Sequence, residues 1–428
     1  MLASDVIAVP DGVRCSATPL ALPRLLHRAL TNPLRMWTQE HFAKLVVPHH
    51  SVAGKRVVVS DPAILRHILV TEPENFPRDA LQQRIIRRVT GDSLFSAQGD
   101  EWRHQRKLLA GLFSPAQLQA YRSALETIAA TACQTLTDFK GEAFDLFGFT
   151  GAIAVEAVNR TLLGGRLAEP ARQVDRSIQD FALMRGRLRI SDLAPFAVPL
   201  LDGWRQAPRC VHARSTAVLA APRAEGSAPD AVDTLQGDGQ LSFRQRRDNI
   251  STLLGAGSDT TGAAMAWAVL LASCDAQAAR MLTNDGEDAP RAVILESLRL
   301  FPPAPVFSRT TLKTCTIGGT RFAKGTDIII APWVIHRHRA LWADADMFDA
   351  TRFLPENAHR IPRFAFLPFG GGPRICIGQG LAMLELETVL PALFRHFRFE
   401  PASPLPVELR QVITLRPKCP VLVRATPR

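Results

Sequence analysis

One cysteine of this chain lies in surroundings suited to binding a metal ion. Cys376 belongs to the stretch Phe369-Gly370-Gly371-Gly372-Pro373-Arg374-Ile375-Cys376-Ile377-Gly378. A metal-binding thiolate needs positive charge, N–H donors and an apolar cover. Arg374 supplies the charge, and Phe369 can screen the sulfur from water. The residues after Gly378 have helical periodicity, so Cys376 is predicted to lie near a helix N-terminus, where free N–H groups favour a negative charge.

The glycines of this stretch fit the same interpretation. Glycines 370 to 372 let the backbone fold tightly, and Gly378 allows a flat ligand to approach just beyond the sulfur. For a lone cysteine beside a glycine-rich turn, a buried structural role is the usual alternative. The combined pattern F-x-x-G-x-R-x-C-x-G favours a metal ligand instead.

A second group of reactive side chains stands in an otherwise apolar segment, Ala256-Gly257-Ser258-Asp259-Thr260-Thr261. Burying an unpaired carboxylate is costly, so Asp259 must meet solvent or a partner, or be kept for proton chemistry. Thr260 can donate a hydrogen bond to the Ala256 carbonyl. The small residues leave room for a small molecule against the backbone, although for glycine and alanine alone close helix packing is the favoured explanation.

Both motifs resemble those of the cytochrome P450 family, the haem-thiolate monooxygenases. The resemblance implies that Cys376 is the axial ligand of a heme b iron. It also implies that Phe369, Arg374 and Gly378 contact the cofactor, and that Asp259 and Thr260 take the acid and alcohol roles in oxygen activation.

Further residues match the family in the expected order along the chain. Glu296 and Arg299 share a helical face, and with Arg352 they resemble a structural triad that locks the cysteine region. The resemblance also implies haem propionate partners and walls of a substrate pocket, and the sequence itself contains a histidine pair without a second cluster of metal ligands. The residues are Trp102, Arg106 and Arg309 for the propionates, Ala256, Val306 and Phe307 for the pocket, and His336 and His338, which favour hydrogen bonding or a surface position over a metal site.

The elements that must position these residues are mostly helical. Ser242 and Gln245 form a capping box ahead of an apolar segment that reaches about Cys274, which predicts one long helix. Short strands are predicted at 45–50, 55–60 and 311–332, and a helix is predicted to begin at Asp61-Pro62. Residues 71–99 look irregular, and 221–240 look like a surface loop.

This pattern predicts a mainly α protein with small β-sheets. The resemblance adds a single cytochrome P450 domain over 1–428, with haem between the long central helix and the cysteine-loop helix; residues 1–40 are guided by no motif.

The net charge and the composition limit which classes of partner and which compartment are expected. The net charge is +11 over 428 residues, but the basic residues are dispersed and no nucleic-acid motif appears, so nucleic acid is not expected. The scattered cysteines suit a reducing compartment, and the N-terminal region lacks an apolar run long enough for a membrane anchor. We therefore expect a cytoplasmic protein without an integral membrane anchor.

The sequence thus predicts a monooxygenase that inserts one oxygen atom of O2 into a fatty acyl, terpenoid, steroid or aromatic substrate. No flavin-binding motif or iron–sulfur cysteine set is present, so electrons are expected from a ferredoxin or flavodoxin with its NAD(P)H reductase. Two alternatives stay open: a peroxide-driven haem-thiolate hydroxylase, against which Asp259 and Thr260 argue, and a non-catalytic haem sensor or electron carrier.

Overall fold

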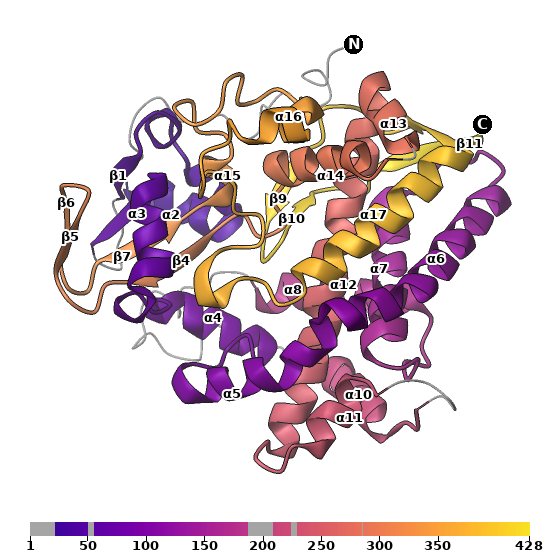
Figure 1. Ribbon diagram of the computed structural model, residues 1–428, viewed down its shortest axis with the longest axis horizontal. Helices are drawn as coiled ribbons and strands as arrows, with labels where there is room; N and C mark the ends of the chain where they lie inside the picture. Colours follow the sequence, from indigo (N-terminus) through magenta and orange to yellow (C-terminus); the bar gives the residue numbers. More distant parts are fainter. Residues whose placement is uncertain (1–21, 50–54, 187–208, 224–228, 285) are drawn as a thin grey trace.

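The computed structural model describes residues 22–49, 55–186, 209–223, 229–284 and 286–428. Helices form most of the molecule, and the larger β-sheet lies to one side of them (Figure 1). The prediction of a mainly helical protein with small sheets is therefore confirmed. Among the described residues, no helix combines the length and apolar character that crossing a membrane requires.

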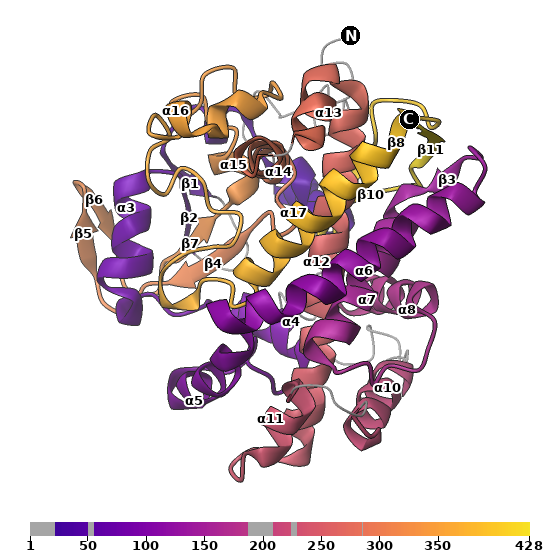
Figure 2. The same cartoon turned by 45° about the vertical axis from the view of Figure 1, so that its right-hand side comes forward.

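The long helix α12 (Phe243–Cys274) begins where the capping box predicts. The Ser242 side chain accepts from the Gln245 N–H, and the Gln245 side chain accepts from the Ser242 N–H. Most residues from Ser258 to Ala272 are buried, because other helices surround this part of α12 (Figure 2). Its closest neighbour is α7 (Leu146–Leu162).

Glycine allows α12 and α7 to approach closely. A Cβ added to Gly262 would lie 2.9 Å from the Cα of Gly151, and the Thr150 hydroxyl donates to the Gly262 carbonyl at 2.8 Å. A Cβ on Gly257 would lie 2.7 Å from Val158 Cγ2. Gly257 thus serves helix packing, and the expectation that it leaves room for a small molecule is wrong, because α7 fills that space.

The helix that follows the cysteine, α17 (Gln379–His396), runs beside α6 (Pro115–Asp138) in both views (Figures 1 and 2). It also packs against α12, α13 (Ala276–Thr283) and α14 (Asp288–Leu300). The start of α17 is therefore fixed by several helices, and the loop before it is anchored at one end.

The larger sheet has the strand order β1-β2-β7-β4. Its strands are β1 (Val46–His49), β2 (Arg56–Val59), β7 (Asp327–Ile330) and β4 (Phe307–Thr310). The predicted pair β1 and β2 is antiparallel, whereas β2 and β7 are parallel. The residues after α14 thus join the same sheet as the N-terminal strands through β4, with β7 between them.

Three smaller sheets complete the β-structure. They are β5 (Cys315–Ile317) with β6 (Thr320–Phe322), β9 (Leu409–Gln411) with β10 (Leu415–Pro417), and β3 (Phe144–Asp145) and β8 (Phe397–Pro401) on either side of β11 (Leu422–Pro427). The β10 strand touches the middle of the molecule, because the Trp267 indole of α12 donates to the Leu415 carbonyl at 3.4 Å.

The other helices are short or peripheral. They are α2 (Leu22–Thr31), α3 (Pro62–Arg66), α5 (Gly99–Ala110), α8 (Ala171–Arg185), α10 (Arg209–Ala220), α15 (Pro332–Ile335) and α16 (Pro355–Ala358). Helix α3 begins as predicted, with the Asp61 carboxylate accepting from the N–H groups of Ala63 and Ile64. A one-turn π-helical segment, His67–Thr71, follows it.

Two segments predicted to be irregular are helical. Residues 80–90 form α4 (Ala80–Thr90), in which no residue is fully buried. Its apolar residues Leu81, Ile85 and Val89 recur at i, i+4 and i+8, which is typical of a helix. Residues 231–237 form α11 (Ala231–Gly237), where the Asp230–Asp233 capping box meets Arg166 at 2.7 Å from each carboxylate. A distant partner stabilises α11, whereas α4 has a local cap and apolar spacing that the prediction did not use.

Candidate active site

The loop that carries Cys376 has a backbone that requires glycine. Gly370 and Gly372 have φ values of +72° and +70°. A Cβ on Gly372 would lie 1.7 Å from the carbonyl oxygen of Leu69, in the π-helical segment. The Cys376 N–H donates to the Phe369 carbonyl at 3.0 Å, which closes the loop. The loop is thus folded by its own backbone and pressed against the N-terminal part of the chain.

The Cys376 thiol is exposed and lies just before α17, whose N-cap is Gly378. Protein atoms around the thiol raise its pKa through burial, while the Gly378 N–H and the nearby Arg106 lower it. A bound cation would be needed to hold the sulfur as a thiolate, since metal coordination deprotonates a thiol. Burial is the largest influence, so the pKa of the thiol is raised, but the Gly378 N–H and the Arg106 guanidinium would stabilise the thiolate once a metal binds.

Beside the thiol lies a cluster of arginines from four separate segments, which we call the arginine cluster. Its members are Arg78, Arg106, Arg309 and Arg374. Burial, together with repulsion within the cluster, lowers the pKa of Arg78, Arg309 and Arg374 to about 10 in each case. Burial also lowers the pKa of Arg106.

The acidic groups near this cluster do not neutralise it. Asp79 raises the pKa of Arg309, and Glu74 raises the pKa of Arg374. The Asp79 carboxylate is already engaged by the Gln82 N–H at 2.9 Å and by the Ser308 hydroxyl, and the Glu74 side chain is 91% exposed. Gathering like charges in a partly buried place is unfavourable unless an anion joins them. Two propionate groups of a haem are such anions, so these residues fit that cofactor.

Packing holds the cluster in place. The Arg374 guanidinium lies 4.0 Å from the centre of the Trp102 ring and donates to the Ala97 carbonyl at 2.9 Å. Arg309 donates to the Ser308 carbonyl at 2.8 Å, and Arg78 donates to the Phe95 carbonyl. The structure thus brings together the predicted Trp102, Arg106, Arg309 and Arg374.

Arg78 was missed by sequence reasoning. It lies directly before Asp79, the N-cap of α4, in the segment predicted to be irregular. Recognition of that cap would have placed Arg78 at a helix start, but nothing local points to its three arginine neighbours.

Asp259 is buried and paired with a residue from the far end of the chain. The Arg416 guanidinium of β10 donates to Asp259 Oδ1 from Nε at 2.9 Å and from Nη2 at 2.5 Å, and the Thr414 hydroxyl donates to Oδ2 at 2.7 Å. Asp259 therefore meets a partner, one of the outcomes expected for a carboxylate in apolar surroundings. No motif in the last 25 residues pointed to Arg416.

Thr260 stands next to Asp259 but its hydroxyl turns elsewhere. It donates to the Ala256 carbonyl at 2.8 Å, as predicted from the spacing. Ala256 is exposed and Thr260 half-buried, so this turn of α12 presents its hydroxyl away from the α7 interface. Val306 and Phe307, just before and at the start of β4, are half-buried. The pocket role of Ala256, Val306 and Phe307 stays a prediction.

Glu296, Arg299 and Arg352 lie together. Arg299 donates to both oxygens of Glu296 at 2.7 Å, and neither side chain is exposed. Its other donors reach the carbonyls of His336, Ala345 and Met347 at 2.6–2.7 Å. Arg352 Nε is 3.7 Å from Glu296 Oε1. Arg299 thus ties α14 to the segment 336–347, which precedes the cysteine loop.

His336 and His338 are fully buried, so the surface position among the two expectations is wrong. His336 Nε2 accepts from the Leu367 N–H at 2.8 Å, and its Nδ1 lies 3.1 Å from the Arg299 carbonyl. The hydrogen-bonding role is the one that the structure shows. The described ranges hold no group of histidine, cysteine and carboxylate side chains suited to a metal ion.

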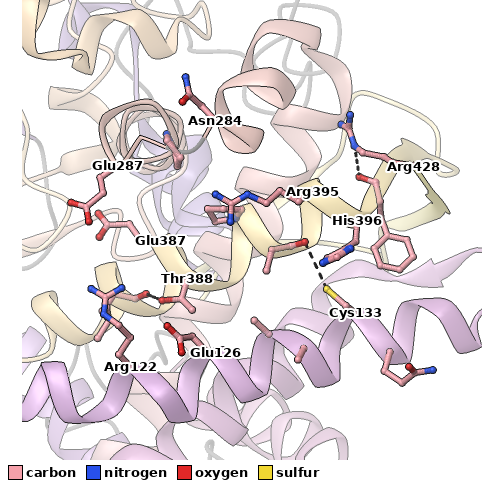
Figure 3. A pocket seen from close by; sticks show the side chains of 18 of the residues that line it. Arg122, Glu126, Cys133, Asn284, Glu287, Glu387, Thr388, Arg395, His396 and Arg428 are labelled. Carbon is pink, nitrogen blue, oxygen red and sulfur yellow. Dashed lines mark hydrogen bonds between the residues drawn. The ribbon is translucent and has the colours of Figure 1, made fainter.

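A cleft of about 910 Å³ lies elsewhere, between α6, α17 and the connection from α13 to α14 (Figure 3). Figure 3 labels basic and acidic side chains around it, among them Arg122, Arg395, Glu126 and Glu387. Cys133 opens onto it, but burial raises the pKa of that thiol. None of the predicted site residues lines this cleft, so the candidate site is the arginine cluster with Cys376.

The comparisons with known proteins agree with this site. A sequence model described as cytochrome P450 matches residues 44–285 and 290–423. Among curated proteins, the chain is similar to "Cytochrome P450 4V2" of Homo sapiens, with 26% identity over 366 residues, 72% of this chain and 69% of that protein. It is 38% identical over 193 residues to "Cyclooctatin synthase" of Streptomyces melanosporofaciens, 41% of this chain and 42% of that protein.

Solved structures share the fold. The structure of CYP175A1 from Thermus thermophilus has 28% identity and a TM-score of 0.72, covering 87% of this chain and 89% of that one. A 6-coordinated cytochrome P450 from the same species has 27% identity and a TM-score of 0.68, with 87% and 92% covered. Family, fold and the arrangement around Cys376 lead to one conclusion: this chain is a monooxygenase of the cytochrome P450 family, whose members hold haem through a cysteine thiolate.

Proposed function

We propose that this chain binds heme b through Cys376 and hydroxylates or otherwise oxygenates a small hydrophobic molecule with O2. The observation that supports this most directly is the arginine cluster beside the Cys376 thiol, a set of partly buried cations without enough carboxylates to neutralise them. When bound, the haem supplies the oxidising chemistry, and the protein supplies binding, orientation and protons.

Residues of the cysteine loop and of the arginine cluster would together hold the cofactor. Cys376 would bind the iron, and the Gly378 N–H together with Arg106 would stabilise the sulfur charge. Arg78, Arg106, Arg309 and Arg374 would bind the propionates, the last of them steadied by its contact with Trp102. Phe369 is half-buried against the central core and would limit water at the sulfur.

Proton supply falls to Asp259 and Thr260. The Thr260 hydroxyl donates to the Ala256 carbonyl, so its oxygen lone pairs can accept a hydrogen bond from a bound molecule. Asp259 is held by Arg416 and Thr414 and cannot reach solvent without breaking these bonds. We propose that Asp259 takes up and releases protons while Thr260 positions the acceptor. This pair favours the O2-using enzyme over both alternatives, since a peroxide-driven hydroxylase or an electron carrier has no need of it.

The substrate class follows from the walls of the site. Ala256, Val306 and Phe307 are apolar and not fully buried, so they would contact fatty acyl, terpenoid, steroid or aromatic groups mainly through apolar surface. Apolar walls position a molecule by shape and by the area removed from water.

We propose an acidic ferredoxin or flavodoxin, with its NAD(P)H reductase, as the source of electrons. The chain carries a net charge of +11, and Lys107 of α5 is exposed one residue after Arg106. Arg103, on the same helix, contributes less than the sequence suggested, because Asp100 lies 2.7 Å and Glu74 3.9 Å from its guanidinium.

Spectroscopy of the haem-loaded protein tests this function. The reduced protein with CO should show the long-wavelength band of thiolate ligation, hydrophobic candidates should shift the haem absorbance, and product should form with O2, ferredoxin and reductase. A wild-type protein that binds haem without that band would refute the assignment. Equal product formation from peroxide alone would favour the peroxide-driven alternative.

A further inference from the structure

A second buried carboxylate lies near Asp259 and has no part in the function proposed above. Asp175, on α8, is 1% exposed. Its Oδ2 accepts from the Gln179 amide at 2.6 Å, whereas its Oδ1 has no hydrogen-bond partner among the described residues. A buried carboxylate with one oxygen unsatisfied is costly as an anion, so the side chain must carry a proton or face a cation.

The helix packing brings Asp175 towards Asp259. A Cβ on Gly151 of α7 would lie 2.4 Å from Asp175 Oδ1, so this carboxylate packs directly against the α7 backbone. Gly151 in turn meets Gly262 of α12, which lies three residues after Asp259 and therefore on the same side of that helix. Helices α7, α8 and α12 lie side by side in both views (Figures 1 and 2).

Arg416 serves both carboxylates. It bonds Asp259 directly, and it is the strongest attractive influence on Asp175. Burial dominates, and with repulsion from Asp259 and Asp145 it raises the pKa of Asp175 to about 7. One guanidinium, bonded to Asp259, thus lowers the pKa of Asp175 as well. A single positive charge cannot neutralise two buried carboxylates, so one of them is expected to carry a proton.

Two arginines on helices that pack against α8 have other partners. Arg214 of α10 bonds Glu169 at 2.7 Å, and Arg88 of α4 donates to the Arg185 carbonyl at 2.9 Å. Asp145, at the start of α7, is exposed, and its own pKa is raised by burial and lowered by its N–H donors and by Arg416 and Arg176. Asp145 therefore offers a route between this buried group and solvent.

We propose that Asp175 holds the proton that replenishes Asp259, with Arg416 as the cation that the two carboxylates exchange. In the resting arrangement Arg416 pairs with the Asp259 carboxylate and Asp175 is a neutral acid. Movement of the guanidinium towards Asp175 would release its proton, which passes to the Asp259 carboxylate; total charge is unchanged. Asp175 then regains a proton from solvent by way of Asp145. Asp175 and Arg416 act through Asp259 and are positioning residues.

This inference rests on the proposed function, but its first test does not require turnover. Infrared spectra of the haem-loaded protein should contain the carbonyl stretch of a protonated carboxylic acid, which disappears as the pH rises through about 7. Asp175→Asn should remove this band, and Asp180→Asn, at an exposed position of the same helix, should retain it. A band that persists unchanged in Asp175→Asn would overturn the proposal.

The second test is the pH profile of product formation. Wild-type turnover should fall as the pH rises through about 7, since the donor loses its proton. Asp175→Asn should reduce turnover about tenfold, less than the roughly 10²-fold typical of a direct proton donor, and should abolish that pH dependence. Profiles of Asp175→Asn and Asp180→Asn that coincide would contradict the relay.

A milder variant covers the case in which Asp175→Asn does not fold. Gln179→Leu removes a hydrogen bond that lowers the pKa of Asp175, so the infrared transition should move to higher pH, and an unmoved transition would count against the proposal. The ferrous–CO band separates the two hypotheses. Its absence from wild type refutes the proposed function, whereas its presence with an infrared titration that ignores Asp175 refutes only the relay.

Discussion

Arg299 donates hydrogen bonds to both carboxylate oxygens of Glu296 at 2.7 Å, and both side chains are completely buried. Arg299 also donates to three carbonyls of the segment before the cysteine loop. A pair of this kind costs desolvation free energy to bury, so its value lies in joining two parts of the chain and not in the attraction alone.

Removal of Glu296 should therefore destabilise the protein strongly. Glu296→Ala leaves Arg299 buried without its counter-charge, and a loss of about 3–5 kcal/mol in the free energy of unfolding is expected. Chemical denaturation monitored by far-UV circular dichroism measures this. Glu356→Ala, at an exposed position of α16, serves as the control and should change the free energy of unfolding by no more than about 0.5 kcal/mol. Equal stability of the two variants would contradict the structural role.

Replacement of Cys376 should abolish thiolate ligation. Cys376→His offers the iron a nitrogen in place of sulfur, so the long-wavelength ferrous–CO band should vanish. Survival of the band would show that another cysteine binds the iron. Cys315→Ser is a suitable control, since Cys315 lies in the β5–β6 hairpin, away from the arginine cluster.

Loss of the Thr260 hydroxyl should uncouple electron consumption from product formation. In Thr260→Ala haem binding should persist, while the share of reducing equivalents found in product falls by about tenfold or more, because a positioned proton pathway is lost. Thr260→Ser keeps a hydroxyl that can still donate to the Ala256 carbonyl. The measurement is the amount of product formed per NAD(P)H consumed. Equal values for the wild type and for the alanine and serine variants would argue against this role of Thr260.

The buried His336 should make the protein sensitive to acid. Burial, with repulsion from Arg299 and Arg337, lowers its pKa to about 3. Between about pH 6.5 and 3 the unfolded chain binds a proton that the folded protein does not, so stability should fall as the pH falls, by up to about 1.4 kcal/mol per pH unit. His336→Gln should flatten this slope by about one proton, and His359→Gln, at an exposed site, should not. Unfolding free energies measured from pH 7 to 4 provide the comparison.

Electron transfer from an acidic partner should depend on salt. The first-electron rate with a ferredoxin should fall as ionic strength rises, since charges are screened over about 8–10 Å. Lys107→Glu should slow it at low salt more than Lys324→Glu, which changes the net charge equally but lies beyond β6. Stopped-flow reduction measures these rates. A flat salt profile, or identical rates in both variants, would exclude this docking face.

Much of the fold could be predicted because its signals are local. The capping box of Ser242 and Gln245 and the apolar run behind it predict α12, and Asp61-Pro62 predicts α3. Helix α4 was missed although its sequence carries local signals, the Asp79 cap and the apolar residues Leu81, Ile85 and Val89 at helical spacing. Helix α11 depends on Arg166, which is far away in sequence.

The candidate site divides in the same way. The thiol, the acid and the alcohol stand in short motifs, whereas the arginine cluster and the Asp259–Arg416 pair arise from the folding of distant segments onto one another. A sequence shows which side chains are available at those positions, but electrostatic partners of this kind depend on long-range packing.

The contact between Gly372 and the Leu69 carbonyl has a consequence for genetics. A clash between two side chains can be relieved by a second mutation that makes one of them smaller. Here any side chain at Gly372 would collide with a backbone oxygen at 1.7 Å, and every residue that replaces Leu69 brings the same oxygen. No exchange at Leu69 can therefore suppress a Gly372 mutation by trimming a side chain, and a suppressor would have to move the π-helical segment His67–Thr71 as a whole.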